Sequence, residues 1–230
     1  MAKTKVIISI ISITVVLILG FASFFLSGDI SEWITGKTTT SRAFILESHP
    51  INCSVNLTQG LNLVSFPCET AQDPLYVALS NQNNETLKFN YIFVFNPLHA
   101  KDPWGSYKPS LPNWTIQEEI LNLDRRRGYF IYMEEEGTYY AEGLRVPISN
   151  MQLRKGWNLV GYPTTNIKSV EDALQTIQQQ YVSVHAYQTI NDSKEWLHHI
   201  KNEGGTLTHF KPGYGYWIFV EEDVIWRLDW

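Results

Sequence analysis

The sequence lacks the short motifs that mark the common classes of enzyme. It has no HExxH pair for zinc, no GxSxG nucleophile, no Walker phosphate loop and no Rossmann glycine fingerprint. It also lacks an excess of positive charge, since 18 Lys and Arg stand against 23 Asp and Glu and leave a net charge of −5. Proteins that hold nucleic acid phosphates usually carry a basic surface. We therefore predict no catalysis, no metal, no cofactor and no nucleic acid partner, with an extracellular enzyme of unrecognised type as an alternative.

Apolar and aromatic residues are what the sequence does contain. Of the 230 residues, 44% are hydrophobic and 13% are aromatic, including 8 Trp, 12 Tyr and 11 Phe. This composition is typical of a globular protein and not of a disordered chain. The length suits one or two small domains, in which large aromatic side chains supply much of the buried area.

An uncharged apolar run occupies residues 6–26. As a helix it spans about 30 Å, the hydrocarbon thickness of a bilayer. Lys3 and Lys5 precede it, and the positive-inside rule places such a flank in the cytoplasm. We predict that residues 1–28 anchor the protein in the cell membrane by one transmembrane helix, and that everything after them, beginning with a linker at 29–50, is extracellular. A signal peptide cleaved near Ala22 is the alternative, and a pilin-type leader is a third.

The two cysteines, Cys53 and Cys68, begin and end the segment CSVNLTQGLNLVSFPC. This segment is predicted to form two strands around a turn at Gln59-Gly60. Pairing of those two strands would bring the cysteines opposite each other, within disulfide reach. Outside the cell such a bond persists. Two buried free thiols are the alternative.

The chain also carries five Asn-x-Ser/Thr sequons, all beyond the apolar run. They are glycosylation candidates in an exported protein, and each is otherwise a plain polar loop residue. The five are Asn52, Asn56, Asn84, Asn113 and Asn191.

Two phrases occur twice, in the same order. They are GLNLVSFPC at 60–68 and GWNLVGYPT at 156–164, then GYFIYMEEE at 128–136 and GYWIFVEED at 215–223. Repetition in order indicates an internal duplication. We predict one module at 51–146 and a second at 147–230. The offset falls from 96 to 87, so the first module is longer by nine residues, which we place between Phe95 and Ile120.

Each module is predicted to be a small antiparallel β unit with one helix. Gly60 and Gly156 stand where a tight turn needs positive φ. Asp73-Pro74 in the first module, and Ser169 with Asp172 in the second, are typical of helix starts. Short connections favour antiparallel pairing. The fold class is therefore α+β to mainly β, with two tandem repeats behind a transmembrane helix. The strand-like segments are YIFVF, GYFIYM and TYYAEG in the first module, and YVSVHAY, GYWIFV and VIWRLDW in the second.

The pattern GWNLV-x-x-P, then a Trp, then KPGYGYWIFVEED resembles a tandem repeat module of archaeal and bacterial exported cell-surface proteins. Residues 153–230 match best, and 57–143 match more loosely because Arg125-Arg126-Arg127 replaces the Lys-Pro-Gly-Tyr approach of 211–214. The resemblance implies a β-rich extracellular module and no established activity.

The aromatic residues are the candidates for binding. Trp157 and Trp217 lie inside strand patterns, so we expect both in the core. A second group lies in the Pro- and Gly-rich stretch of the first module, where exposed rings would stack on sugars or anchor a protein partner. Packing against the core is the alternative for this group, which comprises Trp104, Tyr107 and Trp114.

Charge contributes one further candidate, the run Arg125–Arg127, which is predicted to be a solvated turn and not a site for an anionic polymer. The leading functional hypothesis is a membrane-anchored extracellular protein that binds or scaffolds partners at the cell envelope, in adhesion or surface-layer contact. Its partners would be the membrane and envelope proteins or glycans. The alternative is a lectin-like protein that binds carbohydrate through the loop aromatics of the first module.

Overall fold

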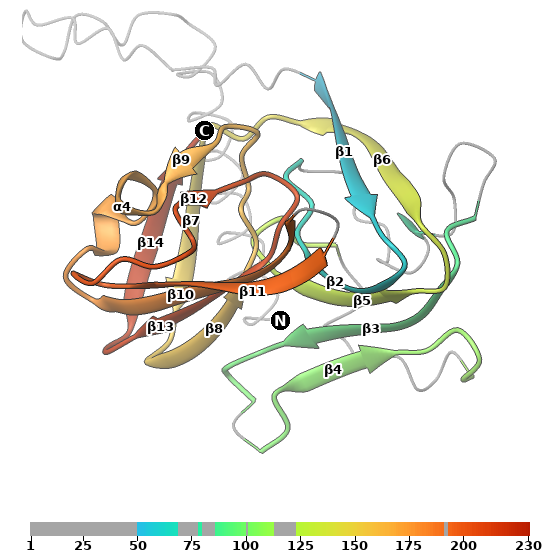
Figure 1. Cartoon of the computed structure of the whole chain (residues 1–230), viewed down its shortest axis with the longest axis horizontal. Helices are drawn as coiled ribbons and strands as arrows, with labels where there is room; N and C mark the ends of the chain where they lie inside the picture. Colours follow the sequence, from blue (N-terminus) through green and yellow to red (C-terminus); the bar gives the residue numbers. More distant parts are fainter. Residues whose placement is uncertain (1–49, 69–77, 80–85, 100, 113–122, 191–192) are drawn as a thin grey trace, which may run out of the picture. The chain divides into compact units, whose positions relative to one another are not determined.

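The structure is a computed structural model that describes residues 50–68, 78–79, 86–99, 101–112, 123–190 and 193–230 (Figure 1). The described chain is mostly β, and its strand pairs are antiparallel, as predicted. The predicted anchor at 6–26 and the helix start at Asp73-Pro74 lie outside the described residues. Within the ranges above, no helix is long and apolar enough to cross a membrane.

The first half of the described chain, residues 50–146, contains a four-stranded sheet of order β2-β5-β3-β4 and a separate strand pair, β1-β6. The tight turns around glycine and the alternation of apolar residues predict these strands, with one exception. The stretch that holds Trp104 and Tyr107 was predicted to be a loop, but it forms strand β4, which pairs with β3. The strands are β1 (Pro50–Leu57), β2 (Gly60–Val64), β3 (Phe89–Phe95), β4 (Trp104–Tyr107), β5 (Tyr129–Met133) and β6 (Gly137–Leu144).

The second half, residues 147–230, contains a four-stranded sheet of order β8-β13-β10-β11, a pair β7-β14 and a short pair β9-β12. The Ser169 hydroxyl caps α4 by accepting a hydrogen bond from the backbone N–H of Asp172, so the predicted helix start is confirmed. The elements are β7 (Ile148–Leu153), β8 (Gly156–Val160), β9 (Lys168–Ser169), α4 (Val170–Ala173), the 3-10 helix η2 (Gln175–Ile177), β10 (Tyr181–Ile190), β11 (Ser193–Ile200), β12 (His209–Phe210), β13 (Tyr216–Val220) and β14 (Val224–Asp229).

Each half packs its own hydrophobic core. Alternate residues of a strand point to opposite faces, so one face of each sheet is buried against its strand pair. In the first half the buried cluster includes Val55, Ile92 and Ile131. In the second half it includes Ile218 and Trp226, together with the apolar residues of α4. Among the residues that the structure describes, the opposite faces of both sheets form no buried cluster of their own.

Several local features recur in both halves. Gly60 and Gly156 both adopt the predicted positive φ, 83° and 98°. Two residues later, the side-chain amides of Asn62 and Asn158 close the same turn. Each Oδ1 accepts from a backbone N–H four residues earlier, and each Nδ2 donates to that residue's carbonyl and to the glycine carbonyl. Both turns therefore aim the following strand in the same way.

The two halves are joined through the ends of β2 and β8. Val64 at the end of β2 forms an isolated bridge with Tyr214, and Val160 at the end of β8 forms one with Arg127. Between them the buried Ser65 hydroxyl donates to the Tyr214 carbonyl at 2.8 Å and accepts from the backbone N–H of Tyr162 at 3.0 Å. Each half thus supplies backbone partners to the last residue of a strand in the other half.

Cys53 and Cys68 form a disulfide with a Cα–Cα distance of 6.1 Å, as predicted. The predicted hairpin that led to it is wrong, because β1 pairs with β6 and β2 pairs with β5. The turn at Gln59-Gly60 carries the chain from the strand pair into the sheet instead of folding β1 back on β2. The disulfide therefore ties the strand pair to the segment that leaves the sheet.

Removing this disulfide should destabilise the first half. A Cys53→Ser, Cys68→Ser variant loses the constraint on a loop of about 15 residues, which corresponds to about 3 kcal/mol of unfolding free energy. Both sulfur positions are buried, so serine is also a poor fit there. Urea denaturation followed by circular dichroism measures the loss. A variant as stable as the wild type would contradict a structural role for the bond.

Two of the five sequon asparagines are described. Asn52 and Asn56 are both exposed on β1, on the face opposite the buried Cys53 and Leu57. Asn84, Asn113 and Asn191 lie outside the described residues. Glycosylation stays a prediction for all five.

Candidate ligand-binding face

Aromatic rings gather on the outer face of both four-stranded sheets. On β13, Tyr216 and Ile218 point into the core while Trp217 and Phe219 point away from it. On β5, Phe130 likewise points away from the core. We call the group of side chains linked there by ring contacts of 6.5 Å or less the aromatic face. It consists of Phe95, Trp104, Phe130, Trp157, His185, Tyr187, Trp196, His198, Trp217 and Phe219.

The aromatic face crosses the joint between the halves. Trp217 lies at its centre, with its ring centroid 5.0 Å from Phe95 and 5.9 Å from Trp104, both of the first half. The ring centroid of Phe130, in the first half, lies 6.5 Å from that of Trp196 in the second half. Neither half alone presents this arrangement, so the geometry of the face depends on how the halves pack.

A hollow of about 390 Å³ opens on the aromatic face. Its lining is almost entirely apolar, and the rings stand at steep angles to one another. The planes of Trp157 and Trp217 cross at 88°, those of Trp157 and His185 at 68°, and those of Phe95 and Trp217 at 63°. The rings therefore meet edge to face instead of forming one flat platform, and the hollow that they line is open to solvent. The lining residues are Phe95, Trp157, His185, Trp196 and Trp217.

His185 is the titratable group in the lining of the hollow. Its Nε2 lies 3.3 Å from the Ser183 hydroxyl, and its ring packs against Trp157 at 5.3 Å. Burial lowers the pKa of His185, and the nearby His198 on β11 lowers it further when charged. At neutral pH the imidazole is therefore uncharged, and the lining of the hollow carries no net charge.

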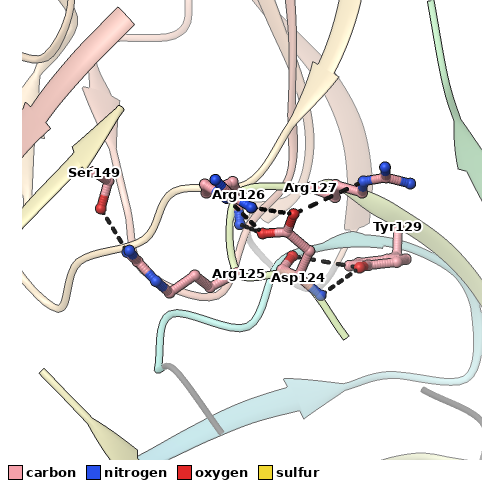
Figure 2. Close-up of polar contacts among 6 residues, drawn as sticks. All are labelled: Asp124, Arg125, Arg126, Arg127, Tyr129 and Ser149. Atoms are coloured by element: carbon pink, nitrogen blue, oxygen red, sulfur yellow. Dashed lines mark hydrogen bonds and ion pairs between the residues drawn. The ribbon is translucent and has the colours of Figure 1, made fainter. Parts of the chain in front are cut away.

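Buried tyrosines fix the turns that lead into β5 and β13, the two strands that carry Phe130 and Trp217. The Tyr129 hydroxyl accepts from the backbone N–H of Asp124 at 2.9 Å, just before β5 begins (Figure 2). The Tyr216 hydroxyl accepts from the backbone N–H of Lys211 at 2.6 Å, just before β13 begins. Phe130 and Trp217 directly follow these tyrosines, so the approach to each strand positions one central ring of the face.

The run Arg125–Arg127 lies in the turn that leads into β5. The Arg126 guanidinium makes two contacts with the Asp124 carboxylate, at 2.9 and 3.0 Å, and Arg127 lies at 4.0 Å (Figure 2). Burial by itself would raise the pKa of Asp124, but the hydrogen bonds and charge of Arg126, with the charge of Arg127, outweigh it and hold that pKa below its usual value. The contacts of Arg126 and Arg127 with Asp124 therefore stabilise this turn.

Arg125 does not lie in a solvated turn, as the sequence interpretation had it. Only 7% of the residue is exposed, and its guanidinium donates to the buried Ser149 hydroxyl of the second half (Figure 2). Its main-chain oxygen also lies against Gly161. The prediction was wrong because the joint between the halves covers this position, and no local pattern reports that.

A more polar pocket of about 360 Å³ lies where the strand pair of the first half meets the second half. Lys194 of β11 reaches into it, and its ammonium donates to the backbone carbonyls of Gln59 and Leu61. Burial lowers the pKa of Lys194. Because these carbonyls satisfy the ammonium, we interpret Lys194 as a tether between the halves.

The structure separates the three residues predicted to bind a ligand. Trp104 belongs to the aromatic face and is 40% exposed. Tyr107, three residues along the same strand, is turned to the other side and packs against the core residue Phe89 at 6.1 Å. Trp114 lies outside the described residues.

The expectation that Trp157 lies in the core is wrong. It is 42% exposed on the aromatic face, and Trp217 is only partly buried there. Sequence reasoning therefore missed most of the face. The period of two in GYWIFV does place Trp217 and Phe219 on one side of a strand. Because the other side, Tyr216, Ile218 and Val220, is equally apolar, the pattern lacks the contrast that identifies the solvent side.

Among the residues that the structure describes, no group of three or more His, Cys, Asp or Glu is placed to hold a metal ion. Comparisons with family models, with curated protein sequences and with solved structures found no match. The chemistry of the aromatic face is therefore the basis for assigning a function.

Proposed function

We propose that this protein is a non-catalytic binding protein of the cell exterior, held at the membrane by its N-terminal segment, and that the aromatic face is its binding surface. One observation carries the proposal. Three tryptophans, Trp104, Trp157 and Trp196, are 40%, 42% and 52% exposed on the sides of the sheets that face away from the cores. Exposed apolar patches of this kind mark interaction sites, and tryptophan is enriched where binding energy concentrates.

Location outside the cell is supported by three independent features. The disulfide between Cys53 and Cys68 suits an oxidising compartment. The sequons Asn52 and Asn56 lie exposed on β1. The apolar run at 6–26 is long enough to anchor the chain. These features agree with the resemblance to exported cell-surface modules.

We further propose that the two halves are duplicated copies of one module. The strand orders β2-β5-β3-β4 and β8-β13-β10-β11 correspond when each first-half strand is matched to its counterpart. Register shifts fall at matching places, between Phe89 and Tyr91 and between Tyr181 and Ser183. The glycine-asparagine turns and the tyrosine hydroxyl contacts also correspond.

This correspondence revises where the first copy is longer. Asn62 matches Asn158 at an offset of 96, and Trp104 matches Trp196 at 92. Tyr129 matches Tyr216 at 87. Four extra residues (96 − 92) therefore precede β3 and five (92 − 87) follow β4. The alignment of Tyr91 with Tyr181 is replaced by that of Phe89 with Tyr181.

Loss of exposed rings from the aromatic face should weaken partner binding. In the native membrane, chemical crosslinking of the full-length protein should yield a defined adduct. Trp157→Ala and Trp196→Ala should each reduce its amount at least about ten-fold, because each removes a central apolar contact. Ile225→Ala is the matched control, since Ile225 is 61% exposed on β14 and outside the face. Equal adduct from all four proteins would contradict the proposal.

The alternative function, binding of carbohydrate through Trp104, can be tested separately. Trp104 stands at the edge of the sheet on β4, exposed as a sugar-stacking ring would be. Binding to a glycan array that is lost in Trp104→Ala but kept in Ile225→Ala would favour it.

A further inference from the structure

The lining of the hollow restricts what it accepts. Five rings line this solvent-open hollow, and the structure brings no carboxylate, amide or hydroxyl of the described residues into that lining. A sugar bound against this lining would meet only the indole and imidazole nitrogens of these rings as polar groups, so hydroxyl groups turned toward the lining would be poorly paired, which is unfavourable. A ligand group without hydrogen-bond donors or acceptors leaves no polar group unpaired there. The hollow therefore favours such a group over a polyhydroxylated one.

The orientation of the rings narrows the choice further. Trp217 meets both Trp157 and Phe95 edge to face, and all three rings line the hollow. The negative face of an aromatic ring attracts a cation, tryptophan most strongly, and recognition of quaternary ammonium by several rings relies on this attraction. Resting on the proposed role of the aromatic face, we propose that the hollow binds a quaternary ammonium group, such as the trimethylammonium headgroup of choline.

Charge supports a cationic occupant. Beyond Lys5 the chain carries 16 Lys and Arg against 23 Asp and Glu, a net of −7 (16 − 23). No Lys or Arg of the described residues lines the hollow. A cation therefore meets an attractive overall field and no fixed positive charge at the site.

The direct test compares two ligands of nearly equal shape. Choline and its uncharged isostere 3,3-dimethyl-1-butanol differ in the quaternary nitrogen, which is carbon in the isostere. They are titrated calorimetrically into the full-length protein in an uncharged polyoxyethylene detergent. Choline should bind at one site, and the isostere at least ten-fold more weakly. Trp157→Ala should weaken choline binding at least ten-fold, while Ile225→Ala leaves it unchanged.

Acid should weaken the same binding. His185 is flanked by His198 on β11, which is the titratable group that acts on it, while β13 and β8 present Trp217 and Trp157. Protonation of His185 would place a positive charge in the lining and repel a cation, so choline affinity should fall as the pH is lowered through the lowered pKa of His185. A His185→Gln variant should show a smaller pH response, and binding of an uncharged ligand should show little.

The outcomes separate the two proposals. Equal affinity for choline and the isostere would overturn the ammonium assignment in favour of a plain apolar ligand. Binding of cello- or chito-oligosaccharides at Trp157, without choline, would overturn it in favour of the lectin-like function. In both cases the aromatic face is still a binding surface. If no probe binds and crosslinking is unchanged in the tryptophan variants, the proposed function falls as well. Should Trp157→Ala not fold, Trp157→Phe, which keeps a ring, takes its place and should bind choline more weakly than the wild type does.

Discussion

A Trp226→Ala variant should unfold with a free energy about 4 kcal/mol lower than that of the wild type. The Trp226 side chain is fully buried in the core of the second half, with its ring 5.6 Å from Phe210. Its indole N–H donates to the Ala173 carbonyl at 2.7 Å, tying β14 to the end of α4. Truncation removes the largest buried side chain of that core, leaves a cavity and deprives the carbonyl of its donor. Urea denaturation followed by circular dichroism measures the change.

The neighbouring residue supplies the control for this variant. Ile225 on the same strand points to the opposite side and is 61% exposed. Ile225→Ala should change the unfolding free energy by no more than about 0.5 kcal/mol. If the two variants lost similar stability, the assignment of the buried face of β14 would be wrong.

A Gly161→Ala variant should lose at least about 3 kcal/mol and lose ligand binding with it. A Cβ at this position would lie 2.3 Å from the Arg125 carbonyl oxygen and 2.7 Å from that of Arg127. Both atoms belong to the backbone of the other half, so no side-chain rotation relieves the overlap and the halves must separate. Because Phe95 lines the hollow from the first half, separation also opens the hollow.

Gly60→Ala distinguishes this effect from ordinary glycine strain. Gly60 has a φ of 83° and no atom within 4 Å of the position of a Cβ. Alanine there should cost about 1–2 kcal/mol through left-handed backbone strain alone, with ligand binding kept. Calorimetric titration and urea denaturation of both variants make the comparison. A Gly161→Ala protein that binds as the wild type does would show that the joint yields without disturbing the face.

Some of the candidate site was open to prediction from sequence. Trp104 was selected because it stands in a Pro- and Gly-rich stretch, and it does belong to the aromatic face. Tyr107 was selected for the same reason and packs against the core instead, because a strand turns residues three apart to opposite sides. His185, Trp196 and Trp217 were not selected. They lie on β10, β11 and β13, three neighbouring strands of one sheet, and which side of that sheet is buried depends on packing against distant segments that no local pattern reports.

The sequence by itself determined the local structure of this protein. Positive-φ glycines, alternating apolar residues and the Ser169 cap produce turns, strands and a helix start from contacts within a few residues. It also indicated the partners in the disulfide, since Cys53 and Cys68 are the only cysteines.

The tertiary structure alone decided which strands pair, which faces are buried and where the halves meet. β1 pairs with β6, some 80 residues later in the chain, and not with the nearby β2. This pairing places Val55 and Leu57 of β1 in the core of the first half. Trp157 on β8 stays exposed although its sequence context is apolar. The core of the second half forms on the opposite side of its sheet, where the strand pair β7-β14 contributes Met151 and Trp226. Pairing and burial depend on contacts between distant segments, whose free energies no short stretch of sequence reveals.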